Sequence, residues 1–235
     1  MAGSPRSFSI VVPVLDEAAV IGESLAALRP LRAAGAEVIV VDGGSRDDTR
    51  AVAAPLADRV LEAPRGRSSQ MNAGAAAARG DVLVFLHADT TLPARALEAI
   101  GAALEGGRHA WGRFDVTISG GGVALAIVAA MMNARSRWSG IATGDQAMFA
   151  RRDAFEKAGR FPAIPLMEDV ALSKALKAIS PPACLRERVV TSGRRWRKHG
   201  TARTVVLMWR LRLEYAMGAD PRSLARRYDA GHGPA

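Results

Sequence analysis

Cysteine is nearly absent from this sequence: Cys184 is the single one among 235 residues. One cysteine can form no disulfide within the chain, and it can build neither a cysteine-rich zinc site nor a CxxC redox site. Long apolar runs are absent too, because the longest, residues 123–132, has ten residues, whereas a membrane-spanning helix needs roughly 20. No apolar segment typical of a secretory signal precedes residue 9. These absences predict a cytoplasmic protein that does not span a membrane.

Two glycine-rich nucleotide-binding loops are also missing. The sequence contains no GxxxxGKS/T loop, and the first strand-like segment, residues 8–15, leads into Asp16-Glu17 and not into a glycine-rich turn. P-loop nucleotide hydrolases and dinucleotide-binding dehydrogenases are therefore excluded. The run Gly120-Gly121-Gly122 precedes an apolar helix-like segment, a position more typical of a flexible turn than of a phosphate-binding loop.

What the sequence does contain is an alternation of short β-rich and helix-like segments. The predicted strands of the first half are 8–15, 37–41, 59–62 and 82–86, with helices at 19–33, 47–57 and 68–78 between them. Ser45 and Asp48 are expected to form a capping box at the start of the second helix. This order is typical of a parallel sheet with crossover helices. The second half is less regular, with a strand at 113–118 and helices at 123–137, near 168 and at 204–217.

The net charge of +9 is concentrated near the C-terminus. Residues 186–227 hold 12 arginines and lysines against three acidic residues, so that the other 20 basic and 20 acidic residues cancel. Such an asymmetry predicts an anionic partner at this end, either phosphate groups or anionic lipid. A solvated arginine-rich face explains the same pattern without a partner. Nucleic acid is not expected, because no nucleic-acid-binding signature accompanies the charge.

Acidic residues recur in loops that follow the predicted strands and at one helix start. Ligands of open α/β sheets bind at the carboxyl ends of strands, so we expect these side chains to converge on one crevice. Carboxylate oxygens suit both a divalent metal ion and a hydroxyl-rich ligand such as a sugar. Each residue taken alone is equally well explained as a helix cap. The set comprises Asp16-Glu17, Asp42, Asp89, Asp145 and Glu168-Asp169.

These carboxylates stand within a longer series of motifs. The series is Pro13-Val14-Leu15-Asp16-Glu17, Asp42-Gly43-Gly44-Ser45 with Asp47-Asp48-Thr49, Gly66-Arg67, Gln70-Met71-Asn72-Ala73-Gly74, His87-Ala88-Asp89, Gly144-Asp145-Gln146-Ala147-Met148-Phe149 and Glu168-Asp169. In order and spacing it resembles the family 2 glycosyltransferases. Within that family the chain is most similar to a small bacterial subgroup of arsenosugar-biosynthesis-type glycosyltransferases, through residues 70–72, 144–146 and 191–196.

The resemblance implies a GT-A fold, which is an α/β fold with a mostly parallel central sheet flanked by helices and a less regular C-terminal half. We expect a single domain over residues 1–235, which at 49% apolar content can bury a sufficient core. Its expected parts are a nucleotide-sugar-binding half at about 8–110, an acceptor and catalytic half at about 111–200 and a basic helical tail at about 201–235.

For the donor, the resemblance implies a UDP- or GDP-sugar whose base contacts Asp42, in a pocket that Glu17 and the Pro13 backbone also line. Two arginines before a predicted helix are expected to steady the diphosphate. Asp89 takes the place of the last carboxylate of the family's metal-binding motif and would hold Mg²⁺ or Mn²⁺. His87 stands where many members have another aspartate, and it either binds the metal or donates a hydrogen bond. The nucleotide-sugar side thus comprises Pro13, Glu17, Asp42, Arg65, Arg67, Asn72 and Asp89.

For the acceptor, the resemblance assigns to Asp169 the removal of a proton from the attacking hydroxyl. The alternative for Glu168-Asp169 is an acidic helix start, which the helix dipole favours. Trp196 either stacks on an acceptor sugar or belongs to the core. Residues 194–196 match the family's Gln-x-x-Arg-Trp element only in part, because Ser192 replaces Gln or Arg. The acceptor side comprises Asp145, Gln146, Glu168, Arg195 and Trp196.

The expected function is therefore inverting, metal-dependent and non-processive transfer of a sugar to an acceptor hydroxyl. The basic tail raises the options of a lipid-linked acceptor and of peripheral contact with an anionic membrane at its inner face. One alternative is a sugar-phosphate nucleotidylyltransferase, although the glycine-rich loop expected after its first strand is missing here. The other is a non-enzymatic module that binds anionic surfaces.

Overall fold

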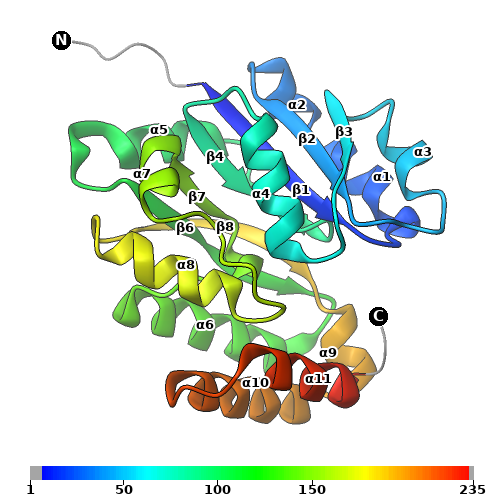
Figure 1. The fold of residues 1–235 in the computed structure, drawn as a ribbon, viewed down its shortest axis with the longest axis vertical. Helices are drawn as coiled ribbons and strands as arrows, with labels where there is room; N and C mark the ends of the chain where they lie inside the picture. The colour runs from blue at the N-terminus through cyan, green and yellow to red at the C-terminus, as the bar shows by residue number, and fades with distance from the viewer. Residues whose placement is uncertain (1–6, 233–235) are drawn as a thin grey trace.

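An eight-stranded sheet organises the computed structural model, which describes residues 7–232 (Figure 1). In spatial order the strands are β3 (Arg59–Glu62), β2 (Glu37–Asp42), β1 (Phe8–Val14), β4 (Val82–Phe85), β7 (Met148–Arg151), β6 (Trp111–Ser119), β8 (Ala183–Ser192) and β5 (Thr90–Thr91). The first four strands run parallel to one another, and so do β6 and β8. Antiparallel pairs join β7 to both its neighbours and β5 to β8. The predicted α/β fold with a mostly parallel sheet is confirmed.

Helices connect and cover these strands. They are α1 (Ala18–Ala27), α2 (Arg29–Ala33), α3 (Thr49–Ala53), α4 (Arg67–Ala77), α5 (Ala96–Leu104), α6 (Gly122–Ser139), α7 (Arg152–Lys157), α8 (Glu168–Lys177), α9 (Arg194–His199), α10 (Thr201–Ala216) and α11 (Pro221–His232). The predicted helix 19–33 is divided at Leu28, because Pro30 in the first turn of α2 cannot donate the backbone hydrogen bond of a continuous helix. Among the described residues, no helix combines the length and the apolar character that crossing a membrane requires.

The sheet carries a separate core on each face. Alternate residues of β1 point to opposite sides, so that Ile10 and Val12 join one buried cluster and Val11 joins the other. On the second face α4 lies very close to the sheet at Gly74, where an added Cβ would come within 2.3 Å of the Val11 side chain. This close packing fixes the N-terminal end of α4 beside the carboxyl ends of β1 and β2.

The C-terminal helices gather at one end of the molecule. In Figure 1, α6, α10 and α11 lie together at the bottom, on the opposite side from α2 at the top. Leu211 of α10 and Leu224 of α11 are fully buried in a third cluster, with Met167 and Val170 around the start of α8. The basic tail is therefore packed against the start of α8 by an apolar cluster of its own.

Candidate active site

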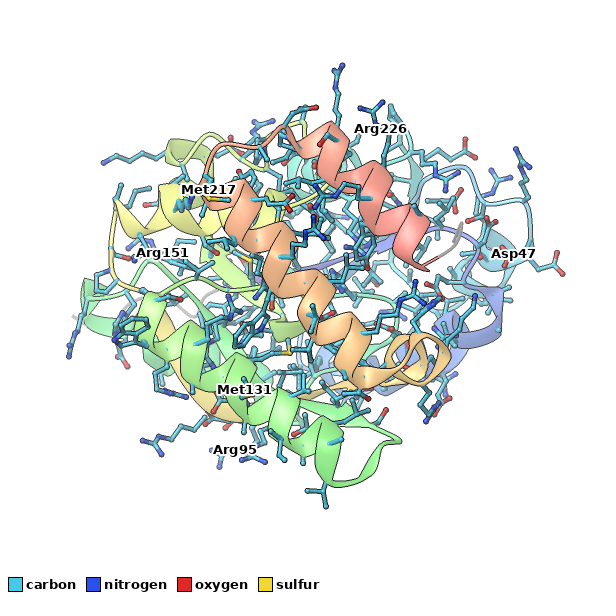
Figure 2. All side chains as sticks on the ribbon, turned by 90° about the horizontal axis from the view of Figure 1, so that it is seen from below. Asp47, Arg95, Met131, Arg151, Met217 and Arg226 are labelled. Atoms are coloured by element: carbon cyan, nitrogen blue, oxygen red, sulfur yellow. The ribbon has the colours of Figure 1, made fainter. Side chains whose placement is uncertain are left out.

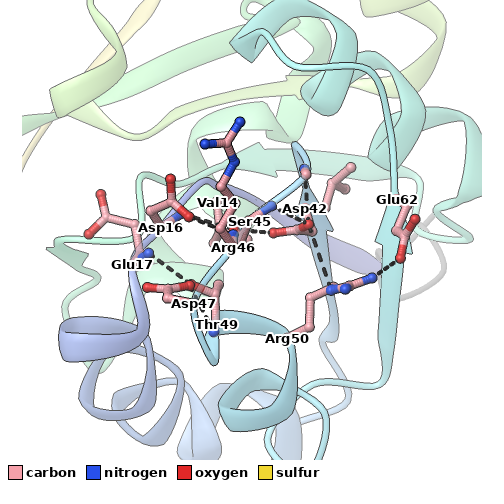
Figure 3. A network of polar contacts seen from close by, with 12 residues as sticks. Val14, Asp16, Glu17, Asp42, Ser45, Arg46, Asp47, Thr49, Arg50 and Glu62 are labelled. Carbon is pink, nitrogen blue, oxygen red and sulfur yellow. Dashed lines mark hydrogen bonds and ion pairs between the residues drawn. The ribbon is translucent and has the colours of Figure 1, made fainter. Parts of the chain in front are cut away.

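Two loops at the carboxyl ends of β1 and β2 are joined by reciprocal hydrogen bonds (Figure 3). The bonds run from Asp16 N–H to Ser45 Oγ at 2.9 Å, Arg46 N–H to Asp16 Oδ1 at 2.8 Å, Glu17 N–H to Thr49 Oγ1 at 2.8 Å and Ala18 N–H to Asp47 Oδ2 at 3.0 Å. The Thr49 hydroxyl also donates to Asp47 and holds the pKa of that carboxyl below its usual value. We call this set the loop clamp, and it holds Asp16 at a left-handed φ of 52°.

Asp42 ends β2 with its side chain fully buried. Its Oδ2 accepts the N–H groups of Gly44 and Ser45 at 3.0 and 2.9 Å, and its Oδ1 accepts the Ser45 hydroxyl. The predicted capping box is therefore wrong: Ser45 bonds to Asp42, and α3 begins at Thr49 without a side-chain cap. The carboxylate orders its own loop, and its contact with a nucleotide base stays a prediction.

Side chains from several segments surround a cavity of about 80 Å³. We call it the carboxylate cavity, and it is lined by Pro13, Glu17, Arg67, His87, Ala88, Asp89 and Asp145. These residues come from β1, the loop before α1, the start of α4, the loop after β4 and the 3₁₀ turn Gly144–Gln146. The fold thus brings together most of the residues expected on the nucleotide-sugar side, together with one expected on the acceptor side.

The turn at residues 144–146 contacts both His87 and Asp169. Asp145 Oδ1 lies 3.3 Å from Nδ1 of His87. The turn also packs tightly against the same ring, because a Cβ added at Gly144 would lie 2.3 Å from Nε2 of His87. On its other side, the Gly144 N–H donates to Oδ2 of Asp169 at 2.9 Å. Asp169 is therefore held next to the His87-Asp145 pair although it starts a different helix.

The acidic pair that opens α8 has two different environments. Glu168 is only 5% exposed. Burial is the main cause that raises the pKa of its carboxyl, and the charge of Asp169 adds to this shift, whereas Arg67 opposes it. Asp169 is partly exposed, and its Oδ1 accepts the Val170 N–H at 2.7 Å. Two backbone donors thus orient the Asp169 carboxylate, while Glu168 lies beneath it.

Arg67 supplies positive charge to the carboxylate cavity. Loss of hydration lowers the pKa of Arg67 more than any single neighbour raises it, but the carboxylate of Glu168 opposes this effect. Tyr228, Asp145 and Asp169 add to the attraction, so the pKa of Arg67 is raised. Tyr228 belongs to α11, which means that the basic tail reaches the edge of the cavity.

Two further spaces adjoin the carboxylate cavity. A connecting cavity of about 60 Å³ shares Asp89 and Asp145 with it and is also lined by Trp196 and Tyr228. An apolar groove of about 420 Å³ between α6 and α10 shares Asp145 and Trp196 with the connecting cavity. Trp196 thus faces both spaces while it also packs against the core.

Several predicted site residues have other roles or lie elsewhere. The Asn72 amide donates to the Phe161 carbonyl at 2.8 Å and accepts the Phe161 N–H at 3.1 Å, so it ties α4 to the loop before α8. Gln146 is fully buried and forms a capping box with Thr143. Arg65 is exposed and does not line the carboxylate cavity. The side chain of Arg195 lies outside the described part of the structure.

Gln70 is a positioning residue that the sequence reasoning missed. Its Nε2 donates to the carbonyls of Val14 and Val41, at 2.7 and 2.8 Å, and so joins the ends of β1 and β2. Its place in the Gln-Met-Asn motif was the only signal, because no local pattern shows which carbonyls a glutamine will reach.

A divalent cation would find carboxylate oxygens here, but no complete cage. Asp89 and Asp145 line the carboxylate cavity with His87, and within the described residues no three histidine, cysteine, aspartate or glutamate side chains could hold an ion together. Mg²⁺ that binds with a nucleotide is usually held by one or two carboxylates, with phosphate oxygens and water completing its shell. The donor set fits a cation shared between Asp89 and a bound diphosphate.

Comparison with known proteins agrees with this arrangement. Residues 9–158, which include β1, the loop clamp and the 144–146 turn, match the model of glycosyl transferase family 2. The chain belongs to glycosyltransferase family 2. This also confirms the family-level resemblance, whereas the arsenosugar-type subgroup is not confirmed.

Curated relatives within the family are similar over part of the chain. Glucosyl-3-phosphoglycerate synthase of Mycolicibacterium paratuberculosis is 33% identical over 102 residues, which cover 39% of this chain and 31% of the relative. The PGL/p-HBAD biosynthesis glycosyltransferase of Mycobacterium bovis is 37% identical over 92 residues, 36% of each chain. The matched segment thus spans about a third of the length of these two relatives.

Solved glycosyltransferase structures show the same fold. A mannosyltransferase from Pyrobaculum calidifontis, in complex with GDP-Man and Mn²⁺, superposes with a TM-score of 0.66 at 20% identity and covers 94% of this chain and 67% of its own. Glucosyl-3-phosphoglycerate synthase from Mycobacterium tuberculosis, with Mn²⁺, UDP and glucosyl-3-phosphoglycerate, gives 0.58 at 22% identity and covers 79% and 71%. The likeness shows that this chain has a GT-A-like fold.

Glu168→Gln tests the buried acidic pair. Because the folded-state pKa of Glu168 is raised, the folded chain keeps this proton at pH values where the unfolded chain has lost it, so the stability of the wild type falls as pH rises through that window. Glutamine carries no charge at any pH. We expect Glu168→Gln to raise the Tm near neutral pH and to lose this advantage near the ordinary pKa of glutamate, as measured by calorimetry. The exposed control Glu105→Gln should leave the Tm unchanged at both pH values, and a lower Tm for Glu168→Gln at neutral pH would contradict the assignment.

Proposed function

We propose that the chain is an inverting, metal-dependent glycosyltransferase that moves a sugar from a UDP- or GDP-sugar to an acceptor hydroxyl. The observation that carries this proposal is the position of the 144–146 turn. Asp145 of this turn lines the carboxylate cavity, which suits the diphosphate of a nucleoside diphosphate, and the Gly144 N–H binds the carboxylate of Asp169. A donor bound in the cavity would thus present its anomeric carbon next to a group that can accept a proton.

The donor's diphosphate would lie between Arg67 and the side of the cavity that Asp89 lines. Arg67 starts α4, so the free N–H groups of that helix's first turn add to its positive charge. A Mg²⁺ or Mn²⁺ ion held by Asp89 and the phosphates would offset the negative charge that grows on the leaving diphosphate. Structural relatives in complex with Mn²⁺ and UDP or GDP-Man support this part of the proposal.

Transfer then proceeds by a single displacement. The acceptor hydroxyl oxygen bonds to the anomeric carbon while the bond from that carbon to the diphosphate oxygen breaks, which inverts the configuration. Asp169 takes the hydroxyl proton, and its two backbone donors keep the carboxylate fixed as it does so. Glu168 and Arg67 affect the electrostatic potential around the Asp169 carboxylate, and they do not contact the acceptor.

The reaction is proposed to be non-processive, with one domain carrying both halves of the site. Ser192 replaces the Gln or Arg of the family's Gln-x-x-Arg-Trp element. The loop after β1 carries Asp16 and Glu17, so nothing favours a nucleotidylyltransferase. The subgroup resemblance adds little about the substrate, because Gln70, Asn72 and Gln146 bond within the protein.

We further propose peripheral contact with an anionic membrane through α10. Val206, Trp209, Leu213 and Met217 are each at least 60% exposed and recur at helical spacing along this helix and its end. Figure 2 shows α10 beside α6, whose Val123, Ile127, Met131 and Trp138 form a second exposed apolar stripe. Arg203 and Arg210 are also exposed, so apolar and basic groups share this surface, as in helices that lie among lipid headgroups.

Asp169→Asn should abolish transfer and spare donor binding. The amide has nearly the same shape and can still accept the Gly144 N–H, but it cannot take the acceptor's proton. We expect the release of nucleoside diphosphate from the sugar donor to fall by about 10²–10⁴-fold, with nucleotide affinity unchanged in a calorimetric titration. Asp153→Asn, an exposed site on α7, serves as the matched control. A variant that kept more than about a tenth of wild-type turnover would rule Asp169 out as the base.

Vesicle co-sedimentation tests the membrane contact. Each basic group near the surface contributes about 1 kcal/mol of attraction to anionic lipid, so sedimentation should rise with anionic lipid content and fall from low to moderate salt. Leu213→Ser should weaken it, whereas the exposed control Ala202→Ser on the same helix should not. Equal sedimentation with neutral and anionic vesicles would show that the arginines are only solvated surface.

A further inference from the structure

The largest cavity described lies outside the carboxylate cavity, between α6 and α10. This groove of about 420 Å³ has a mostly apolar surface, to which Val128, Met131, Met132, Val205 and Met208 contribute. Figure 2 shows the two helices side by side, with Met131 on α6. A ligand along most of this surface can be held only by apolar contact, which favours a hydrocarbon chain.

Two arginines interrupt the apolar lining, Arg135 from α6 and Arg212 from α10. Within the described residues, the buried Nε and Nη2 of Arg135 and the buried Nε of Arg212 have no hydrogen-bond partner. Neighbouring arginines on the same helices are paired: Arg137 with Asp115, and Arg210 with Glu214. Buried cationic nitrogens without partners are costly, so this arrangement suits a site that an anion completes.

The two guanidinium groups are close enough to influence each other. The pKa of Arg135 is lowered to about 10, mainly by burial and next by the charge of Arg212. Arg135 therefore remains charged at neutral pH. Asp169 acts in the opposite direction. The negative charge of Asp169, the proposed catalytic base, therefore acts on Arg135. The arginine pair thus lies near the acceptor side of the proposed reaction.

The groove also adjoins the active site. Asp145 lines the groove, the connecting cavity and the carboxylate cavity, and Trp196 and Met208 line the first two. A molecule lying in the groove can thus extend past Trp196 towards Asp145 and the neighbouring Asp169 without crossing the core.

We propose that this groove is the acceptor site, and that the acceptor is an anionic amphiphile. Its phosphate group lies between Arg135 and Arg212, its hydrocarbon chain lies along α6 and α10, and its hydroxyl group extends past Trp196 towards Asp169. The identity of this ligand as the acceptor rests on the function proposed above. The groove's own binding chemistry does not, because it follows from the unpaired arginines and the apolar lining. Neither half suffices alone: inorganic phosphate leaves the apolar lining empty, and a neutral or cationic chain leaves the arginines unpaired.

Tryptophan fluorescence of the full chain provides a direct readout. Trp138, Trp196 and Trp209 line the groove, whereas Trp111 is fully buried in the core. We expect dodecyl phosphate, titrated below its micelle concentration, to change the fluorescence saturably. Dodecyltrimethylammonium and inorganic phosphate should bind at least about ten-fold more weakly, because each lacks one half of the ligand.

Substitutions test the arginine pair. Arg135→Gln and Arg212→Gln should each weaken dodecyl phosphate binding by about ten-fold or more, whereas Arg212→Lys should retain most of it. Arg226→Gln, an equal change of charge on the exposed side of α11, should leave it unchanged. The substituted arginines have unpaired nitrogens, so their removal should not lower the Tm, and the Tm measured for each variant shows that a loss of binding is not a loss of folding.

The groove assignment is overturned if dodecyl phosphate and dodecyltrimethylammonium bind equally well, or if Arg212→Gln binds dodecyl phosphate like the wild type. It is also overturned if sedimentation shows a dimer that covers the groove and excludes the probe. A parallel calorimetric titration with UDP and GDP separates this inference from the proposed function. Arginine-dependent binding of dodecyl phosphate without any nucleotide binding would support the groove assignment and contradict the proposed glycosyltransferase function. Nucleotide binding without any binding of dodecyl phosphate would support the proposed function and contradict the groove assignment.

Discussion

Backbone N–H groups held by carboxylate and hydroxyl oxygens fix the two loops on which the rest of the site is built. The loops after β1 and β2 have no regular hydrogen bonding of their own, so Asp16 and Asp47 supply acceptors across the gap, and Ser45 and Thr49 do the same with their hydroxyls (Figure 3). Because the clamp sets where Glu17 and the end of β1 lie, it also sets one wall of the carboxylate cavity. Several acidic residues of this region are therefore structural, although their spacing is that of the family's motifs.

The second constraint is the short turn at residues 144–146, which has to lie against three partners. Its glycine lies so close to the His87 ring that an added Cβ would displace the ring, its backbone holds Asp169, and Asp145 lines the carboxylate cavity, the connecting cavity and the apolar groove. The capping box between Thr143 and Gln146 buries both residues and keeps the turn rigid. The proposed positions of the donor, the base and the acceptor thus depend on a few residues whose own side chains mostly point into the protein.

Sequence reasoning predicted what depends on local pattern and strand direction. The strand 59–62 matches β3 from end to end, and Pro13, Glu17 and Asp89 converge because the carboxyl ends of neighbouring strands do. Asp145 joins them from the turn before β7, which lies at the same edge of the sheet because β7 runs antiparallel to β4. Sequence reasoning failed where long-range packing decides. Asn72 reaches a backbone 89 residues away. The strand β7 has only four residues, and the charged residues 186–188 interrupt the apolar pattern of β8, so neither strand was predicted. The arginine pair was equally hidden, since Arg135 and Arg212 meet only when α6 and α10 pack together.

The proposed sugar transfer requires a nucleoside diphosphate to bind at the carboxylate cavity, with a metal ion held jointly by Asp89 and the diphosphate. The most direct measurement is a calorimetric titration of the full chain with UDP and with GDP, each with and without Mn²⁺, repeated with Asp89→Ala and with Asp153→Ala as the matched control. We expect one nucleotide to bind at least about ten-fold more tightly with Mn²⁺, the control to behave like the wild type, and Asp89→Ala to lose the effect of the metal. Binding that ignores Mn²⁺, or that keeps its full dependence on Mn²⁺ in Asp89→Ala, would contradict the account.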